Sequence, residues 1–282
     1  MTNSIFQPTS EKRIQIDYSL IDADQCPVCG ESMKKWREKL PDGTEKCPPA
    51  CPNCGHALPL EKHQRMNVGD RIANSLRMSA IKKMKTNSII QDPSIWKCLF
   101  ENFDLLDEPT RIAAEKAEYW AKEVLRGQPL HAVIAGKPGV GKTHLSMAMV
   151  NYISSKDYKT SCIFVSYQKL YEDLKFCMSD PQAQKMLQGT IMKEIKHCDF
   201  AVIDDLGAEL GRMEDNNQAT SYNTGIISAL AEARAEKATV YTTNLSSKQI
   251  KFAYGERAYS RIMNGAAKNI INLQNTADKR MR

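Results

Sequence analysis

Residues 136–143, with the sequence Gly-Lys-Pro-Gly-Val-Gly-Lys-Thr, constrain the fold of this chain more than any other stretch. They follow the mostly apolar run 130–135, which predicts a strand, and they precede residues 145–150, which predict a helix. Glycines let the backbone turn tightly and direct successive N–H groups inward, where the helix adds the positive end of its dipole. A chance glycine-rich turn is the alternative, and the strand–loop–helix context favours a phosphate-binding loop instead.

Each position of this loop has an expected task. Lys142 is expected to reach the β- and γ-phosphates of a nucleotide, and the Thr143 hydroxyl is expected to ligate Mg²⁺. The full set expected to contact the nucleotide is Gly136, Lys137, Pro138, Gly139, Val140, Gly141, Lys142, Thr143 and His144.

The composition is that of a folded, soluble protein. The 282 residues are 42% hydrophobic and 26% charged, which allows one large domain or two smaller ones. No stretch approaches the ~18 apolar residues that a transmembrane helix needs, and the first 25 residues show no signal-peptide pattern. We therefore expect a cytoplasmic protein without a membrane partner.

Five of the nine cysteines lie within residues 26–54, in a pattern typical of zinc sites. Two Cys-x-x-Cys-Gly turns each offer a pair of thiolates around a glycine-permitted bend, as a tetrahedral Zn²⁺ site requires. A redox Cys-x-x-Cys pair is the less favoured alternative, because there are two such pairs and no thioredoxin-like context. The expected ligands are Cys26, Cys29, Cys51 and Cys54, with Cys47 or His56 as substitutes. So small a module would gain its stability from the metal.

The segment 62–85 carries seven basic residues and one acid, so it accounts for the whole formal net charge of +6. Ile72, Leu76, Ala80 and Met84 repeat every four residues and predict an amphipathic helix. Its basic side chains either contact nucleic-acid phosphates or form a solvated face of a linker helix, and both interpretations stay open.

Strand and helix patterns alternate around and beyond the loop. Runs at 160–165, 200–203 and 239–243 predict strands, and helical spacing at 170–177, 187–195 and 225–237 predicts the helices between them. Another helix is expected from Thr110, as its N-cap, to Arg126. This order predicts an α/β fold with a parallel sheet flanked by helices and a ligand at the carboxyl ends of the strands.

Polar residues follow two of these strands. Asp204 is expected to hold Mg²⁺, and Asp205 to orient or deprotonate the attacking water. Asn244 is expected to bond that water or the γ-phosphate, because the loop and both strand ends should meet at one edge of the sheet.

Further candidates lie on predicted helices. Arg257 and Arg261 are four residues apart on one helix face, where one could neutralise the γ-phosphate charge of a neighbouring subunit or simply form a salt bridge. Tyr167, Tyr171 and Phe176 could stack on bases of single-stranded DNA, although aromatic residues at helical spacing are more often core.

Taken together, residues 136–143, 202–207, 241–244 and 255–262 resemble the AAA+ ATPase domain of DnaC/DnaI-type replicative helicase loaders, over roughly residues 86–270. The zinc-binding module ahead of it is similar to the DnaI branch and its phage relatives. The resemblance implies ATP, Mg²⁺ and Zn²⁺ as cofactors, a homo-oligomer formed through the ATP interface, and binding of single-stranded DNA and a hexameric ring helicase. It makes Arg261 the first and Arg257 the second candidate for an arginine finger, and Asn244 a sensor residue.

The expected organisation is an N-terminal arm and zinc module (1–60), a basic helical linker (61–85) and an AAA+ P-loop NTPase domain (86–282). Three alternative functions stay open. An IstB-type transposition or recombination helper ATPase shares these motifs. A P-loop small-molecule kinase would need an acceptor pocket and a closing lid, and a non-catalytic switch would bind nucleotide and DNA without turnover.

Overall fold

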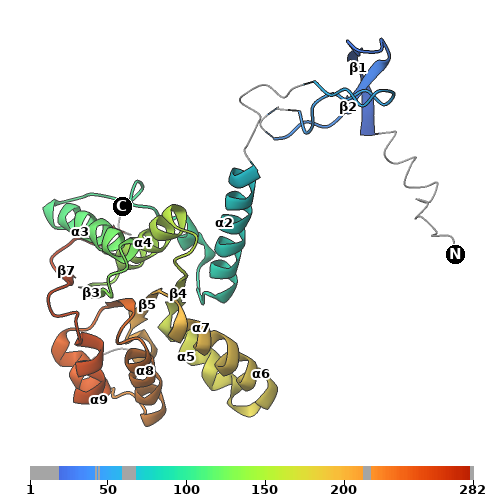
Figure 1. The fold of residues 1–282 in the computed structure, drawn as a ribbon. Helices are drawn as coiled ribbons and strands as arrows, with labels where there is room; N and C mark the ends of the chain where they lie inside the picture. The colour runs from blue at the N-terminus through green and yellow to red at the C-terminus, as the bar shows by residue number, and fades with distance from the viewer. Residues whose placement is uncertain (1–18, 42, 44, 59–67, 212–216, 280–282) are drawn as a thin grey trace. The chain divides into compact units, whose positions relative to one another are not determined.

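The computed structural model describes residues 19–41, 43, 45–58, 68–211 and 217–279 (Figure 1). The chain divides into two compact units, Met1–Ala73 and Asn74–Arg282. The basic residues Lys62 and Arg65 of the segment 62–85 lie outside the described residues. Among the helices that are described, none combines the length and apolar character that a membrane crossing demands. The three-part division at residues 60 and 85 stays a prediction.

The first unit is built on a short antiparallel pair of strands, β1 (Leu20–Gln25) and β2 (Ser32–Trp36). The two cysteine turns repeat one backbone pattern: Gly30 N–H donates to Cys26 O at 2.9 Å, and Gly55 N–H donates to Cys51 O at 3.0 Å. The described core consists of little more than Met33, Cys26 and Cys51. Such a core is too small to stabilise the unit without a further cross-link.

The second unit contains a five-stranded parallel sheet, which confirms the predicted fold class. The strands run in the order β4 (Cys162–Ser166), β5 (Phe200–Leu206), β6 (Ala238–Thr243), β3 (His131–Gly136) and β7 (Ile270–Leu273). Four of them were predicted. The edge strand β7 was not, because its four residues alternate between exposed and buried without a flanking pattern.

Helices cover both faces of this sheet (Figure 1). One face packs on α3 (Glu108–Leu125) and α4 (Lys142–Lys156), through a core that includes Trp120, Ile134 and Val202. The other face packs on α5 (Tyr167–Phe176), α7 (Met192–His197), α8 (Ser221–Ala233) and α9 (Ser247–Met263). Neighbouring strand residues such as Val202 and Ile203 therefore enter different cores, as the strand period of two requires.

Short elements complete the second unit: η1 (Pro93–Lys97), η2 (Cys177–Ser179), α6 (Pro181–Met186), η3 (Leu187–Ile191) and η4 (Ala208–Leu210). The predicted start of α3 at Thr110 is wrong. Asp107 is the N-cap, because its carboxylate accepts from Thr110 N–H at 2.9 Å while the Thr110 hydroxyl accepts from Asp107 N–H at 3.0 Å. This capping box places Thr110 inside the first turn.

The basic segment is helical, as predicted, and forms α2 (Val68–Asn87). Its apolar stripe is only partly covered: Ile72 and Leu76 are 56% and 47% exposed, whereas Met84 is buried. The Met84 end packs in the core of α3 and α4, and Lys83 pairs with Glu194 at 3.1 Å. The amphipathic pattern therefore buries one end of the helix and leaves the other in solvent.

Candidate nucleotide-binding site

The loop between β3 and α4 has the backbone that its glycines predict. Gly139 and Gly141 adopt φ values of 81° and 95°, which side chains with a Cβ rarely accept. Gly141 caps α4, so Lys142 and Thr143 begin the helix at its positive end. Lys142 is buried, and its Nζ donates to Lys137 O at 2.9 Å and to Asn244 Oδ1 at 2.5 Å. The lysine is thus held between the loop and the end of β6.

Asp204 lies directly beside Thr143. The Thr143 hydroxyl donates to the Asp204 carboxylate at 3.0 Å, and the Thr242 hydroxyl donates to it at 2.6 Å. Burial, followed by the charge of Asp205, raises the pKa of Asp204 to about 7, while both hydroxyls and Lys142 oppose the shift. A divalent cation at this position would favour the ionised carboxylate and offset the desolvation.

Asp205 and Asn244 complete a polar cavity of about 230 Å³. Its lining consists of Pro138, Gly139, Gly141, Lys142, Thr143, Asp205 and Asn244. The predicted meeting of loop, β5 and β6 at one sheet edge is therefore what the structure has, because β5, β6 and β3 are adjacent and parallel. The roles of the individual residues stay predictions.

The donor set fits Mg²⁺ and a polyphosphate. The Thr143 hydroxyl and the Asp204 carboxylate are hard oxygen ligands, and they already lie within hydrogen-bond distance of each other. The loop N–H groups, the dipole of α4 and the Lys142 ammonium supply positive charge on the same side of the cavity. A phosphate chain placed there would meet these donors and the metal-binding oxygens of Thr143 and Asp204.

Not every predicted contact residue faces this cavity. Val140 is fully buried in the core below the loop, and Gly136 packs against Leu273, whose Cβ would lie 2.9 Å from a Cβ at residue 136. Lys137 is exposed. The His144 ring nitrogen Nε2 lies 2.9 Å from both Leu99 O and Asn102 Oδ1. The nucleotide would therefore meet the backbone of the loop at these positions.

Two segments that the sequence did not predict to be near the loop pack against it: the one that contains Phe103, and residues 278–279. Lys279 N–H donates to Gly139 O at 3.0 Å, and a Cβ on Gly139 would lie 1.8 Å from Asp278 Oδ1. Lys279 Nζ lies 3.4 Å from the centroid of the Phe103 ring, and a Cβ on Gly141 would lie 2.7 Å from that ring. No local motif predicts such contacts, because their partners are far apart in the sequence.

Both candidate arginines lie on α9 beyond a break at Gly255, where φ is 81° and ψ is 164°. Arg261 pairs with Glu232 of α8 at 2.9 Å. Arg257 is exposed and makes no ion pair with the described residues. Neither arginine contributes to the cavity lining, so the prediction that one of them serves a neighbouring subunit stays untested.

In the first unit, the Sγ atoms of Cys26, Cys29, Cys51 and Cys54 all lie within 4.8 Å of one another. The Cys26–Cys54 and Cys29–Cys51 Sγ distances are 3.5 and 3.4 Å. A tetrahedral site with Zn–S bonds of ~2.3 Å would have edges of about 3.8 Å. The Glu31 backbone N–H and the Cys51 thiol lower the pKa of Cys29 to about 7, whereas at Cys54 the opposing His56 backbone N–H is outweighed by burial and the neighbouring thiols, which raise the pKa of Cys54 to about 12. Cys47 and His56 are outside this four-sulfur cluster.

Comparisons with known proteins identify similar proteins over most of the second unit. Residues 126–263 match the family described as IstB-like ATP binding protein. The Escherichia coli K12 protein YdaV, described as uncharacterized, is 27% identical over 237 residues, which are 83% of this chain and 81% of YdaV. The replicative helicase loader DnaC of Buchnera aphidicola subsp. Acyrthosiphon pisum is 24% identical over 210 residues, 74% of this chain and 76% of that protein.

Solved structures share the fold. The crystal structure of the DnaC helicase loader superimposes with a TM-score of 0.54 at 20% identity, covering 64% of this chain and 99% of that one. The crystal structure of DnaI gives a TM-score of 0.50 at 22% identity, covering 68% of this chain and 95% of that one.

Proposed function

We propose that this protein is an ATPase that loads a ring-shaped replicative helicase onto single-stranded DNA, because residues 126–263 match the family of IstB-like ATP binding proteins and the chain is similar, at low identity, to DnaC helicase loaders and to DnaI. The observation that carries the proposal is the joint placement of Lys142, Thr143, Asp205 and Asn244 around one cavity, with the buried Asp204 bonded to Thr143. We expect it to act in the cytoplasm, where such a helicase meets DNA.

The proposed reaction is attack of water on the γ-phosphorus of ATP. The new P–O bond forms as the bond to the β-phosphate oxygen breaks, and ADP leaves. Lys142 would contact the β- and γ-phosphates, Asp205 would orient the water and take its proton, and Asn244 would bond the γ-phosphate or the water. Thr143 and Asp204 would hold Mg²⁺, which supplies charge neutralisation between the β- and γ-oxygens.

The proposed function requires oligomerisation because the arginines of α9 would act on the site of a neighbouring copy. In the proposed assembly Arg261, or second Arg257, reaches the γ-phosphate bound by a neighbouring copy, a contribution worth ~10³–10⁵ in rate where it operates. Arg261 would first exchange its pairing with Glu232, an exposed partner on α8. The Arg261 side chain is half-buried and that of Glu232 is exposed, so solvent reaches and screens the pair from the Glu232 side.

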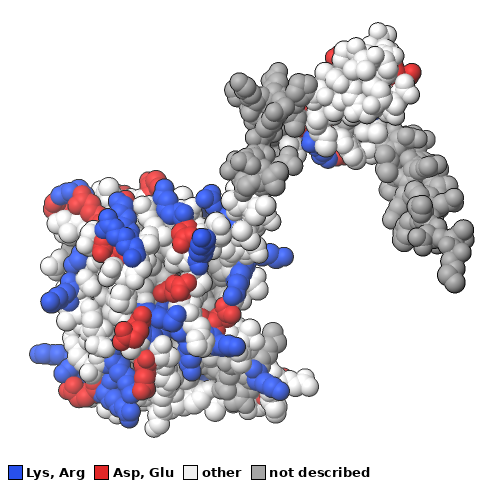
Figure 2. Space-filling model, in the orientation of Figure 1, with Lys and Arg blue, Asp and Glu red and all other residues white. Residues whose placement is uncertain are grey.

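A surface at the end of α5 supports the proposal of single-stranded DNA as a ligand. Phe176 is 84% exposed, Tyr171 and Tyr222 lie with ring centroids 6.4 Å apart, and Lys175 Nζ is 5.5 Å from the Tyr171 ring. Exposed rings beside lysines are the usual platform for stacked bases. Tyr167 does not belong to this surface, because it is fully buried in the core. Figure 2 shows basic and acidic side chains interspersed on the visible face of the second unit.

The zinc module would contact the helicase, since its four-cysteine cluster supplies a rigid scaffold separate from the ATPase domain. The direct test is a pull-down of a purified hexameric replicative helicase by the full chain, with and without a zinc chelator. Capture that the chelator abolishes, together with ATPase stimulated by single-stranded DNA, is the expected result. Intact ATPase activity without capture of any such helicase would reject the loader function.

The match to the IstB-like family motivates one alternative, a transposition or recombination helper ATPase. A helper of that kind would act on duplex DNA. Comparing ATP turnover with single-stranded and duplex DNA of equal length therefore separates the two functions. Stimulation by duplex alone, without helicase capture, would favour the helper.

A further inference from the structure

The Glu209 carboxylate joins three parts of the second unit. Its Oε2 accepts from the Gly207 backbone N–H at 3.0 Å, and its Oε1 accepts from Asn223 Nδ2 at 3.0 Å and from the Tyr254 hydroxyl. Gly207 belongs to the turn after β5, Asn223 to α8 and Tyr254 to α9. One side chain thus ties the end of the aspartate-bearing strand to two helices.

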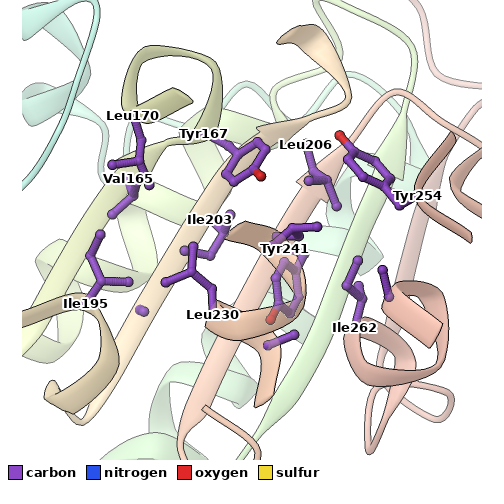
Figure 3. Packing of buried hydrophobic residues seen from close by; sticks show 14 of the residues in the cluster. Val165, Tyr167, Leu170, Ile195, Ile203, Leu206, Leu230, Tyr241, Tyr254 and Ile262 are labelled. Carbon is purple, nitrogen blue, oxygen red and sulfur yellow. The ribbon is translucent and has the colours of Figure 1, made fainter. Parts of the chain in front are cut away.

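A second layer fixes the geometry of this contact. Asn223 is buried, and its Oδ1 accepts from the Tyr167 hydroxyl at 2.6 Å, which orients its Nδ2 group toward Glu209. In Figure 3 the hydroxyl ends of Tyr167 and Tyr254 point toward each other from either side of Leu206. Burial raises the pKa of both tyrosines, so both hydroxyls stay protonated and act as donors. We call Glu209, Asn223, Tyr254 and Tyr167 the Glu209 network.

At one end, the Glu209 network reaches the nucleotide cavity. Gly207 lies two residues after Asp205 and adopts φ of 100°. A Cβ at Gly207 would lie 2.5 Å from Leu245 Cδ1, and Leu245 directly follows Asn244. The turn that Glu209 holds therefore follows Asp205 closely in the chain and packs against the residue after Asn244. A displacement of Asp205 would reach the Glu209 carboxylate through this turn.

At the other end, the network reaches the candidate arginines. Tyr254 is the last residue before the break in α9 at Gly255, and Arg257 and Arg261 follow that break. Regular helical geometry does not continue through Gly255, so side-chain contacts on either side of the break must orient the following segment. Tyr254 supplies such a contact directly before it, and Arg261 pairs with Glu232 on α8, the helix that also carries Asn223.

We propose that Glu209 and Tyr254 are positioning residues that couple the nucleotide cavity of one subunit to the arginine segment it presents to its neighbour. The inference rests on the proposed function, because it needs an arginine supplied between subunits. The Glu209 carboxylate is suited to this task because its two oxygens accept hydrogen bonds from the turn after β5, from α8 and from α9 at once. Hydrolysis in one site would then alter how firmly the next site is completed.

The test uses Tyr254→Phe, which removes one hydroxyl without changing the volume of the ring. The matched control is Tyr259→Phe, the same change in the same helix at a residue outside the network. We expect Tyr254→Phe to lower kcat about tenfold or more, since a small misplacement of a catalytic group can cost up to ~10²-fold. KM for ATP and the affinity for a fluorescent ATP analogue should stay within about twofold. Glu209→Gln should behave like Tyr254→Phe, because the amide NH₂ group would face one of the donors that now bond the carboxylate.

Mixed assemblies locate the defect. Asp205→Asn subunits are expected to keep their arginine segment and lose their own turnover. Mixed one to one with Tyr254→Phe subunits, they would supply the arginine to about half of the Tyr254→Phe sites in a head-to-tail ring. Turnover per Tyr254→Phe subunit should therefore rise to about half the unmodified value. An unchanged kcat in Tyr254→Phe, or no rise on mixing, overturns the coupling.

Two parallel mixtures separate a failure of the coupling from a failure of the proposed function. One combines Arg261→Ala with Asp205→Asn, and the other combines Arg257→Ala with Asp205→Asn. If either arginine mixture regains turnover and the Tyr254→Phe mixture does not, only the coupling through the Glu209 network is rejected. If no mixture regains turnover, the shared site of the proposed function is rejected, and the coupling with it.

Discussion

Asp205 holds a backbone conformation that few side chains accept. Its φ of 57° lies in the left-handed region, and no other described residue apart from glycines shares that sign. Its N–H is fixed by the Thr242 hydroxyl, which also donates to Asp204. Asparagine tolerates this region nearly as well as aspartate, whereas alanine does not. The residue can thus lose its charge without disturbing the strand end.

We predict that Asp205→Asn lowers ATP turnover by about 10²-fold or more, because a general base or water-orienting carboxylate contributes about that much. The affinity for ATP should change by less than about threefold, since the Lys142 contacts remain. Single-turnover phosphate release and equilibrium binding measure the two quantities. Full turnover in Asp205→Asn would mean that another residue acts as the base. If the unmodified chain bound nucleotide without any turnover, the alternative of a non-catalytic nucleotide switch would be favoured.

His131 provides a residue-scale prediction of pH dependence. The ring is buried, its Nε2 lies 2.9 Å from Ala235 O, and its Nδ1 has no partner among the described residues. Burial lowers the pKa of His131, so the unfolded chain takes up a proton at a higher pH than the folded one. Its stabilising contribution is present above pH ~6.5 and is lost as the pH falls through the lowered value.

The melting temperature should therefore fall less between pH 7 and pH 5 in His131→Gln than in the unmodified chain. The exposed His197→Gln is the matched control and should retain the original fall. Thermal unfolding followed by circular dichroism at several pH values gives the comparison. Parallel curves for His131→Gln and the unmodified chain would contradict the prediction.

At the scale of elements, α9 is two helical segments joined at a glycine. Gly255 combines φ of 81° with ψ of 164°, a region that only glycine occupies at low cost. The break sets the direction of the segment that carries Arg257 and Arg261. The helix start is regular, with a capping box between Ser246 and Gln249.

Gly255→Ala should destabilise the second unit by about 1–3 kcal/mol and reduce turnover beyond what the lost stability explains. Gly225→Ala in α8 is the matched control, because a Cβ there meets nothing within 4 Å and should stabilise the helix by about 0.5–1 kcal/mol. Denaturant unfolding monitors both variants. Equal stability of the two would show that the break is not required.

The sequence predicts those elements and residues whose signals are local. The phosphate loop and Asp204 follow from short patterns attached to strands, and the adjacency of β3, β5 and β6 then brings Asn244 to Lys142. The role of Glu209 was not predicted from the sequence, because this residue follows a turn and its carboxylate accepts hydrogen bonds from residues 14 and 45 positions away. Contacts between residues far apart in the sequence, such as Gly139 and Asp278, produce no periodic pattern from which they could be predicted. Amphipathic spacing predicted α2 but not that Ile72 and Leu76 would remain exposed.

At the scale of the whole molecule, the two units have separate cores. Among the described residues of the first, the buried core is Met33 with Cys26 and Cys51, two of the four clustered thiols, whereas the second has its own extended sheet. Metal removal should therefore act on one unit alone.

We predict that a zinc chelator makes residues 19–58 sensitive to protease while ATP affinity changes by less than about twofold, because the second unit contains the whole nucleotide cavity. Limited proteolysis with mass spectrometry and nucleotide binding on the same sample measure both. Measured zinc should be one ion per chain and should be lost in Cys29→Ser. Loss of ATP binding on chelation would contradict the independence of the units.

The pairing of β7 with β3 has a consequence for synthesis of the protein. β3 ends at Gly136, which packs on Leu273 of β7, and Gly139 accepts a bond from Lys279. All of residues 137–269 must be translated before these partners exist. A chain still growing on the ribosome therefore carries an unfinished phosphate loop. ATP bound to this loop would therefore stabilise only the finished fold, and it would favour completed molecules over truncated ones.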